Sequence, residues 1–323
     1  MALLLVADAS STATSVLSVP LFHATGCHAI MVTCAFGGNK LVLMRRWDAG
    51  SALALIEAER INSFGGVPAV PWQILEHPAL NATDTSSVEA IGYGGVPAAP
   101  ELVKRIAQAF PAVSPGNGWG LTETSAVTTQ NSGIDYAQRP DSVGVPVPVC
   151  DVVVGDPHAP LPPENAGELW VRGPNVVREY WGNPQATAHA FVDGWFRTGD
   201  IGRIDADGFV YILDRAKDML IRGGENICCV EVENALYEHP EVMDAAVVGV
   251  PHRVLGEEVG AVVQRVPGGT LSAEKLKAFV SERLAHFKVP VAVEFTMDPL
   301  PRNANGKILK QTLRDVFRGH NVG

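Results

Sequence analysis

The stretch GWGLTET, residues 118–124, places an aromatic side chain between two glycines and follows it with a hydroxyl, a carboxylate and a second hydroxyl. Glycines let a backbone approach a flat ligand closely, an indole can stack on a base, and a carboxylate is a hard oxygen ligand for Mg²⁺. The same letters also suit a glycine-rich turn that opens a helix capped by threonine. Taken alone, the stretch leaves a nucleotide site and an ordinary turn both open.

The sequence before this stretch predicts an α/β layer. Up to about Asn131, short apolar or β-branched runs alternate with helical stretches. The runs include Ile30–Cys34 and Leu41–Met44, and the helical stretches include Ala52–Ile61 and Pro100–Phe110. Such alternation is typical of strands that are covered by helices.

The sequence after it changes to a β-rich pattern between about Gly133 and Leu213. Short strands are divided there by Pro, Gly and Asp turns, and they are Val149–Val154, Gly167–Val171 and Phe209–Leu213. This pattern predicts a small β-barrel or a distorted sheet.

A compact α+β pattern follows the charged run Asp214–Asp218. Its expected elements are a helix at Val230–Glu238, strands at Ala245–Val250 and Val259–Arg265, and a helix that begins with Ser272 as its N-cap. One face of that last helix is apolar, with Leu276, Phe279, Val280, Leu284 and Phe287. It should pack on a small sheet.

The expected fold class is therefore α/β, in three parts. They are a partial α/β subdomain at residues 1–132, a small β-barrel at 133–216 and a mobile α+β C-terminal domain at 217–323.

Composition and net charge exclude some classes of protein. The chain has 323 residues, of which 46% are hydrophobic and 19% charged, as in a folded protein of about two domains. A net charge of −10 argues against general nucleic-acid binding, because it repels phosphate backbones. The run MALLLVA at residues 1–7 is too short for a transmembrane segment and is expected to be a buried strand. Five cysteines without metal-type spacing fit reduced thiols in a cytoplasmic protein.

Two further motifs carry carboxylates and cations. The stretch WFRTGD, residues 195–200, ends in Asp200 just before the hairpin turn at 205–208, and a carboxylate held there could accept two hydrogen bonds from a ribose diol. Alone, a surface aspartate in a turn explains it better. The charged run 214–218 is a candidate hinge, or else a solvated linker. Cys228 and Cys229 are expected to pack rather than react.

Three loops complete the pattern. Lys307 ends the polar loop PRNANGK and could offer a cation to a phosphoryl or carboxylate centre, although a solvated lysine is the commoner outcome. A helix is expected after it at Ile308–Phe317. His23 and the pair Gly94–Gly95 could line a pocket for an apolar acid, or be a core histidine and a turn.

All six segments occur in one order along nearly the whole chain, and that order resembles the adenylate-forming superfamily of acyl-CoA synthetases, luciferases and peptide-synthetase adenylation domains. The resemblance implies ATP, Mg²⁺ and CoA as cofactor and co-substrates, with a fatty or other hydrophobic carboxylic acid as substrate. A homodimer is left open.

The resemblance also implies a role for each matching residue. For the nucleotide, these residues are Gly118, Trp119 stacking near adenine, Gly120, Leu121, Thr122 at the α-phosphate, Asp200 and Arg215 at the ribose hydroxyls, and Asn226. Glu123 would hold Mg²⁺, and His23, Gly94 and Gly95 would line the acyl pocket. Lys307 would serve adenylate formation together with Thr122 and Glu123, the hinge would be at Lys217, and the loop Gly223–Gly224 would admit the pantetheine thiol.

One feature of that family is missing from the sequence. It contains no Ser/Thr/Gly-rich loop ending in Pro-Lys-Gly that would grip the β- and γ-phosphates, and Gly37–Lys40 is too short and lies in the wrong order. We therefore expect a truncated chain that is impaired in adenylation. Two alternatives stay open: an adenylation domain that loads a separate carrier protein, and a non-catalytic protein that binds AMP and acyl groups.

Overall fold

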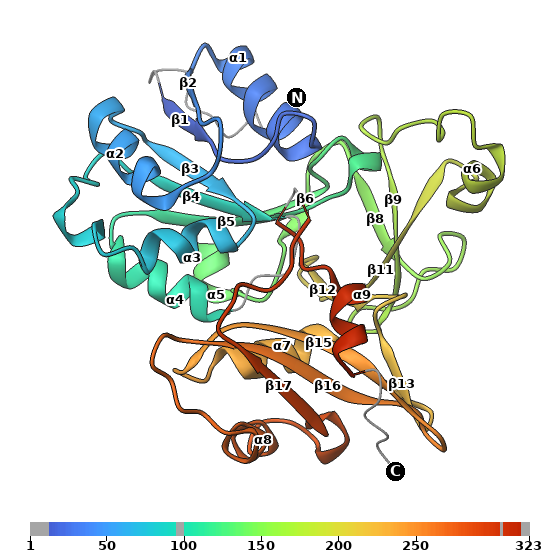
Figure 1. Cartoon of the computed structure of the whole chain (residues 1–323). Helices are drawn as coiled ribbons and strands as arrows, with labels where there is room; N and C mark the ends of the chain where they lie inside the picture. The colour runs from blue at the N-terminus through green and yellow to red at the C-terminus, as the bar shows by residue number, and fades with distance from the viewer. Residues whose placement is uncertain (1–12, 95–99, 304–305, 318–323) are drawn as a thin grey trace. The chain divides into compact units, whose positions relative to one another are not determined.

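The computed structural model describes residues 13–94, 100–303 and 306–317, in two compact units that divide between Ile212 and Leu213 (Figure 1). The strand expected at residues 1–7 and the site residue Gly95 lie outside the described residues. Within the described ranges, no helix combines the length and the apolar character needed to cross a membrane.

The first unit contains a seven-stranded sheet of order β2-β1-β3-β4-β5-β6-β7. The strands are β1 (Thr14–Leu17), β2 (Lys40–Leu43), β3 (Ser63–Gly66), β4 (Ala90–Gly94), β5 (Ser114–Trp119), β6 (Thr129–Ser132) and β7 (Val145–Pro146). Strands β1 to β5 pair in parallel, and β6 and β7 add antiparallel pairs. Parallel pairs need crossovers, which are helical here. In chain order, they are η2 (Thr25–Val32) with α1 (Thr33–Gly37), α2 (Ala49–Glu59), α3 (Ala69–Leu75) with η3 (Leu80–Ala82), and α4 (Pro100–Ala109). The predicted α/β layer is confirmed.

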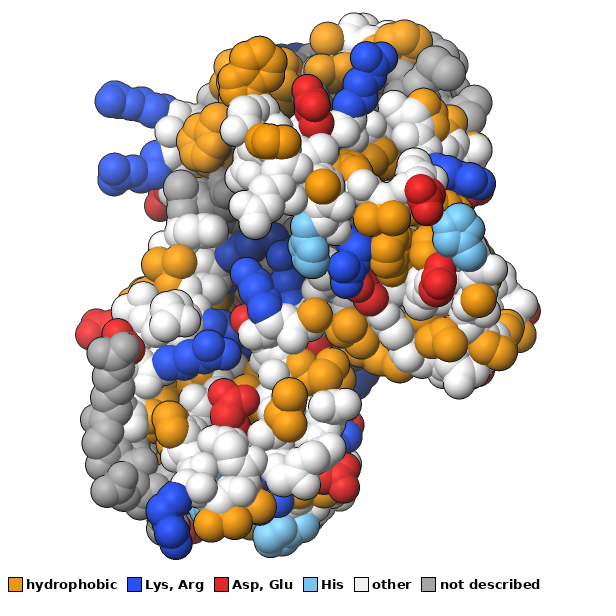
Figure 2. Space-filling model, turned by 90° about the vertical axis from the view of Figure 1, so that its right-hand side faces the viewer, with side chains coloured by type: hydrophobic (Ala, Val, Ile, Leu, Met, Phe, Trp, Pro, Cys, Tyr) orange, Lys and Arg blue, Asp and Glu red, His pale blue; other side chains and the backbone are white. Residues whose placement is uncertain are grey.

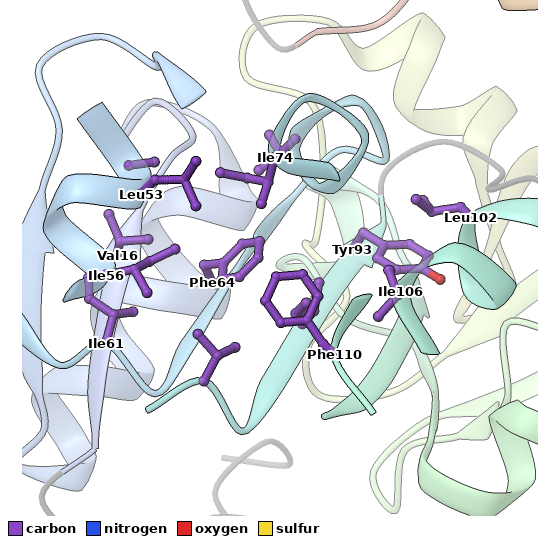
Figure 3. Close-up of a cluster of buried hydrophobic side chains, with 14 of the residues drawn as sticks. Val16, Leu53, Ile56, Ile61, Phe64, Ile74, Tyr93, Leu102, Ile106 and Phe110 are labelled. Atoms are coloured by element: carbon purple, nitrogen blue, oxygen red, sulfur yellow. The ribbon is translucent and has the colours of Figure 1, made fainter. Parts of the chain in front are cut away.

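A buried apolar cluster joins this sheet to its helices (Figure 3). Leu53 and Ile56, three residues apart on α2, point toward the same region as Phe64 of β3. The rings of Phe64 and Phe110 meet edge to face with centroids 6.3 Å apart. Since burying one such side chain contributes about 1.5–3 kcal/mol, this cluster holds the sheet that carries the site.

One predicted strand is wrong. Ile30–Cys34 lies in helix, where the π-helix η2 (Thr25–Val32) continues into α1 (Thr33–Gly37). A short apolar run does not separate strand from helix, and here tertiary context decides. Gly38 ends the helix with a positive φ of 67°, which suits glycine.

The β-rich part of the first unit forms a five-stranded sheet of order β10-β11-β9-β8, with β12 paired to β11. The strands are β8 (Asp151–Val154), β9 (Gly167–Arg172), β10 (Phe191–Val192), β11 (Trp195–Ile204) and β12 (Val210–Arg215). The last of them, β12, runs across the division between Ile212 and Leu213. The short helices α5 (Gly133–Gln138) and α6 (Pro184–Ala190) lie between strands in the sequence. The hairpin turn predicted at 205–208 is present, and Gly208 donates its N–H to Asp205 O at 3.1 Å. The expected barrel or distorted sheet thus takes the form of this sheet.

The second unit is α+β, as predicted. Its sheet has the order β14-β13-β16-β15, and β17 pairs with β16. The elements are β13 (Leu220–Arg222), β14 (Glu225–Ile227), α7 (Cys229–Tyr237), β15 (Val242–His252), β16 (Gly256–Arg265), α8 (Ala273–Ser281), η5 (His286–Lys288), β17 (Ala292–Thr296), α9 (Lys310–Arg314) and η6 (Asp315–Phe317). Ser272 caps α8 by accepting a hydrogen bond from Lys275 N at 3.3 Å. The helix expected at Ile308–Phe317 is shorter, because it begins only at Lys310 and tightens to η6 after Arg314.

On the face drawn in Figure 2, basic and acidic side chains both occur, and hydrophobic ones lie among them. The negative net charge therefore coexists with basic groups at the surface. A polyphosphate ligand depends on such local groups rather than on the net charge.

Candidate active site

Two glycines set the spacing between β4 and β5. Gly94 and Gly118 are direct partners in this parallel pair. A Cβ on Gly94 would lie 2.4 Å from the carbonyl oxygen of Gly118, so a side chain there would push the strands apart. The predicted acyl-pocket residue Gly94 therefore lies directly beside the first residue of the GWGLTET stretch.

The rest of that stretch folds back on itself in a tight loop. Gly120 leaves no room for a side chain, because its Cβ would lie 1.9 Å from Ala126 O. Thr128 N returns to Trp119 O at 2.8 Å. Ser125 and Ala126 have positive φ values of 54° and 96°, which are strained for residues with a Cβ. Close packing around the loop therefore holds the backbone in this conformation.

Thr124 organises this loop from inside. Its buried hydroxyl accepts from Leu121 N and from the Thr128 hydroxyl, both at 2.9 Å. Thr122, one residue before Glu123 in the short 3₁₀ turn η4 (Thr122–Thr124), is exposed. The predicted α-phosphate ligand, Thr122, is thus at the surface of a turn that the Thr124 hydroxyl stabilises from inside.

The structure brings Trp119 and Asp200 together. The indole Nε1 donates to Oδ2 of Asp200 at 2.8 Å, and both side chains are buried. The backbone N–H of Asp200 donates to the Thr198 hydroxyl oxygen at 3.0 Å, and that hydroxyl donates to Leu169 O at 2.7 Å. The carboxylate is therefore fixed on β11 at the edge of the indole, and the two motifs that were predicted to bind the nucleotide are in contact.

Glu123 has two partners that the sequence did not identify. The Tyr180 hydroxyl donates to Oε1 of Glu123 at 2.8 Å, and Val177 N donates to the Glu123 carbonyl at 2.8 Å. Burial, and after it the bond to Glu123, raises the pKa of Tyr180 to about 12. The phenol thus stays a donor at neutral pH. Asn175 adds a further clamp, with its Nδ2 donating to Thr124 O at 2.9 Å.

Mg²⁺ usually takes one or two carboxylates from a protein and completes its shell with phosphate and water oxygens. Glu123 fits this pattern, because it is half-buried and its Oε2 accepts no hydrogen bond in the described part of the chain. Among the described residues, no group of three or more His, Cys, Asp and Glu side chains could hold a metal ion. A cation that also has phosphate oxygens as ligands would need only the one carboxylate of Glu123.

His23 lies in the turn between β1 and η2. The ring Nδ1 of His23 accepts from Thr25 N at 3.2 Å, and the backbone N–H of His23 donates to Pro20 O at 3.1 Å. Gly26 permits this turn, since a Cβ there would lie 2.3 Å from Pro20 O. The imidazole is thus held by local backbone at the start of a helix.

The remaining predicted site residues belong to the second unit, and they are Arg215, Lys217, Gly223, Gly224, Asn226 and Lys307. Gly223 and Gly224 form the two-residue turn of the β13–β14 hairpin, both with positive φ, as a type I′ turn requires. Lys307 N donates to Oδ1 of Asn303 at 3.0 Å. The two cysteines pack as predicted: Cys229 is buried, and burial raises the pKa of Cys228 to about 11.

The chain resembles known proteins over nearly its full length. A family model described as "AMP-binding enzyme" matches residues 3–181, and one described as "AMP-binding enzyme C-terminal domain" matches residues 231–307. The chain is 39% identical over 311 residues to a feruloyl-CoA synthase of Amycolatopsis sp, which covers 96% of this chain and 63% of that protein. It is 40% identical over 303 residues to a long-chain-fatty-acid–CoA ligase of Bacillus subtilis (strain 168), with 91% and 52% covered.

The chain is also similar to solved structures over nearly its full length. ATP-bound MatB from Rhodopseudomonas palustris superposes with a TM-score of 0.87 at 32% identity, over 99% of this chain and 64% of that one. The chain thus spans less than two thirds of the length of each of these three relatives.

Proposed function

Since the chain belongs to the AMP-binding enzyme family, we propose that it carries the nucleotide, acyl and thiol sites of an ATP-dependent acyl-CoA synthetase. The observation that carries the proposal is the 2.8 Å hydrogen bond between Trp119 and Asp200. It joins an indole that can stack on adenine to a carboxylate that can accept ribose hydroxyls. The Gly94–Gly118 pair adds the acyl wall beside the nucleotide.

The reaction has two displacements. A carboxylate oxygen of the acid attacks the α-phosphorus of ATP, and the bond from that phosphorus to pyrophosphate breaks. The thiolate of CoA then attacks the acyl carbon, and the bond from that carbon to AMP breaks. The thiol proton leaves to solvent.

We assign roles by geometry and resemblance together. Thr122, exposed on its turn, contacts the α-phosphate. Glu123, oriented by Tyr180, holds Mg²⁺, which supplies positive charge to the phosphates when bound. Other residues bind the nucleotide or the acyl group, and they are Gly118, Trp119, Gly120, Leu121, Asp200, Arg215, Asn226, His23, Gly94 and Gly95.

The second unit supplies the moving parts in this proposal. Residues 217–323 act as a mobile domain that rotates about Lys217, while residues 1–132 and 133–216 form the two subdomains that hold the nucleotide. Lys307 supplies a cation during adenylate formation. After the rotation, the Gly223–Gly224 turn lets the pantetheine arm pass close to backbone.

The substrate class is a hydrophobic carboxylic acid. Two relatives named for feruloyl and long-chain fatty acyl groups support this, because both acids have large apolar bodies.

Calorimetry with AMP and with a non-hydrolysable acyl-AMP analogue tests the nucleotide site without requiring turnover. We expect both to bind, and Asp200→Asn to weaken binding roughly tenfold through the loss of one charge-assisted hydrogen bond. The matched control is Asp207→Asn, an exposed carboxylate of the 205–208 turn, which should bind like the unaltered chain. Equal affinity of both variants would remove Asp200 from the site.

Product analysis then separates the acceptors. Supplied acyl-AMP is offered with CoA and, in a parallel reaction, with purified carrier proteins. Acyl-CoA supports the proposal, and acyl-carrier product alone would replace it with carrier loading. Binding of the analogue without either product would indicate a non-catalytic AMP and acyl binder, a reading that the missing Ser/Thr/Gly-rich loop favours.

A further inference from the structure

Arg302 connects the loop that carries Lys307 to strand β15 of the same unit. Nη1 of Arg302 donates to the carbonyl oxygen of Gly306 at 2.6 Å, and Nη2 donates to Oδ2 of Asp244 at 2.5 Å. Gly306 directly precedes Lys307. A single planar guanidinium therefore bonds both the backbone next to Lys307 and a carboxylate of β15.

Asp244 is itself held on its other side. Its Oδ1 accepts from the Tyr237 hydroxyl at 2.6 Å and from Ala245 N at 3.0 Å. Its side chain is only 12% exposed, and that of Arg302 27%. Because a carboxylate shielded in this way is costly without partners, the ion pair has a defined geometry rather than a loose surface one.

A second ion pair lies just after Lys307 in the sequence. Nζ of Lys310 is 2.8 Å from Oε1 of Glu233, which also accepts from Val247 N at 2.8 Å. Burial, the largest single cause, would lower the pKa of Lys310, but the neighbouring acidic groups, with Glu233 first among them, together outweigh it and raise that pKa. Lys310 therefore stays charged across the physiological range, and α9 stays attached to α7 and β15.

The described residues at the two ends of this loop bond to each other. Arg302 and Ile308 form a β-bridge, and Asn303 N donates to Lys307 O at 2.9 Å. Lys307 N returns a bond to Oδ1 of Asn303 at 3.0 Å. The backbone of Lys307 is thus defined by its loop, and the loop is fixed to the sheet by the two ion pairs.

We propose that Arg302 and Asp244, with Lys310 and Glu233 as a second anchor, are positioning residues that hold the Lys307 loop on the sheet of the second unit. The inference rests on the proposed function in so far as Lys307 is the cation of adenylate formation. The positioning itself is independent of that role. Arg302 acts through the Gly306 carbonyl, and it needs no contact with substrate.

Arg302→Met tests the anchor, because it removes both hydrogen bonds and keeps an unbranched side chain. Arg283→Met is the matched control, since Arg283 also bonds a carboxylate, Glu238, and a backbone carbonyl, Phe279 O, at the end of α8. Hydrogen exchange of the Asn303 and Lys307 amides is the measurement. We expect exchange at least about tenfold faster in Arg302→Met, from the loss of bonds to a charged group, and no change in Arg283→Met.

Equal exchange at these two amides in both variants would overturn the positioning role. If Arg302→Met fails to fold by circular dichroism, Tyr237→Phe is the second variant, because it removes the hydroxyl that donates to Asp244 at 2.6 Å, with a longer contact to Ala245 O at 3.3 Å, and leaves Arg302 in place. It should give a smaller increase at the same amides, and no increase would again overturn the proposal.

Arg302→Lys adds a second readout. Lysine keeps the charge but cannot bond Gly306 O and Asp244 as a planar fork, so it should rescue thermal stability without restoring slow exchange. Full restoration of slow exchange would show that charge alone suffices. Lys307→Ala separates this inference from the proposed function. In a form of the enzyme that also carries the phosphate-gripping loop, adenylate formation that survives Lys307→Ala would end the proposed role of Lys307, whereas hydrogen exchange in Arg302→Met still decides the anchor.

Discussion

The indole nitrogen of Trp119 lies 2.8 Å from Oδ2 of Asp200, and this hydrogen bond joins the end of β5 to β11, 81 residues later in the chain. Both side chains are buried, so neither group has water as a ready substitute partner. The bond therefore fixes the position of a carboxylate beside an aromatic ring, and each residue depends on the other.

Trp119→Phe keeps an aromatic ring but removes the donor. We expect AMP to bind roughly tenfold more weakly and the chain to unfold at a lower temperature, because a buried carboxylate loses a hydrogen-bond partner. Calorimetry and thermal denaturation measure the two effects. Trp47→Phe is the control, since the Trp47 indole donates to Gln73 at an exposed position. A similar loss of AMP affinity in both variants would contradict the pairing of Trp119 with Asp200 as a nucleotide site.

Gly94→Ala should damage both the fold and the site. Its Cβ would meet Gly118 O at 2.4 Å, whereas a Cβ on Gly92, two residues earlier in the same strand, meets nothing within 4 Å. We expect Gly94→Ala to lower the free energy of unfolding by about 1–3 kcal/mol, as overpacking does, and Gly92→Ala to be close to neutral. Urea denaturation of the two variants gives the comparison. Equal stabilities would mean that β4 and β5 can separate at no cost.

Several elements followed from local rules in the sequence. The N-cap at Ser272 and the turn at 205–208 depend on side chains a few residues away, and both are present. Ile30–Cys34 was wrong because a short apolar run suits strand and helix alike. Tyr180 and Asn175 were missed because their partners, Glu123 and Thr124, lie 57 and 51 residues away in sequence, and nothing local marks them.

The candidate site divides in the same way. Residues that are contiguous in the GWGLTET stretch could be proposed together, and Asp200 could be added only through the resemblance to a family. The contact between Trp119 and Asp200 depends on tertiary structure, because the two residues lie on strands of different sheets. The roles of Lys217 and Lys307 stay predictions, because they concern a rotation that one structure does not contain.

Tyr180→Phe should change the dependence of stability on alkaline pH. The pKa of Tyr180 in the folded state is raised to about 12, whereas the ordinary tyrosine value is about 10. The neutral phenol therefore contributes fully to the free energy of unfolding below a pH of about 10. That contribution is lost as the pH rises from there through about 12. Urea denaturation at pH 8 and at pH 11 should therefore show a smaller drop in stability for Tyr180→Phe than for the unaltered chain. An identical drop would indicate that the phenol is as accessible to titration when folded as when unfolded.

Lys217→Pro tests the proposed hinge. Proline fixes φ at about −65° and should block a backbone rotation, so thioester formation from supplied acyl-AMP and CoA should fall while binding of the acyl-AMP analogue persists. Lys217→Ala is the control, because it removes the charge and leaves the backbone free. Loss of thioester formation in both variants would assign the effect to the lysine side chain, and no loss in either would place the hinge elsewhere.

The 323-residue chain should show little exchange between ATP and pyrophosphate with any hydrophobic acid. Each retained motif is assigned to adenine, ribose, α-phosphate, metal, acyl group or thiol, and the sequence contains no Ser/Thr/Gly-rich loop ending in Pro-Lys-Gly. Backbone N–H groups in such a loop neutralise phosphate oxygens and hold the leaving group in line, so without them the displacement at the α-phosphorus loses both charge stabilisation and orientation. Thioester formation from supplied acyl-AMP involves no pyrophosphate and should be affected far less. Radiolabelled pyrophosphate measures the first reaction and mass spectrometry of acyl-CoA the second, on the same preparation. Robust exchange between ATP and pyrophosphate by this chain alone would contradict the prediction. It would require another phosphate site within the chain, and basic side chains on the described surface would be the first candidates.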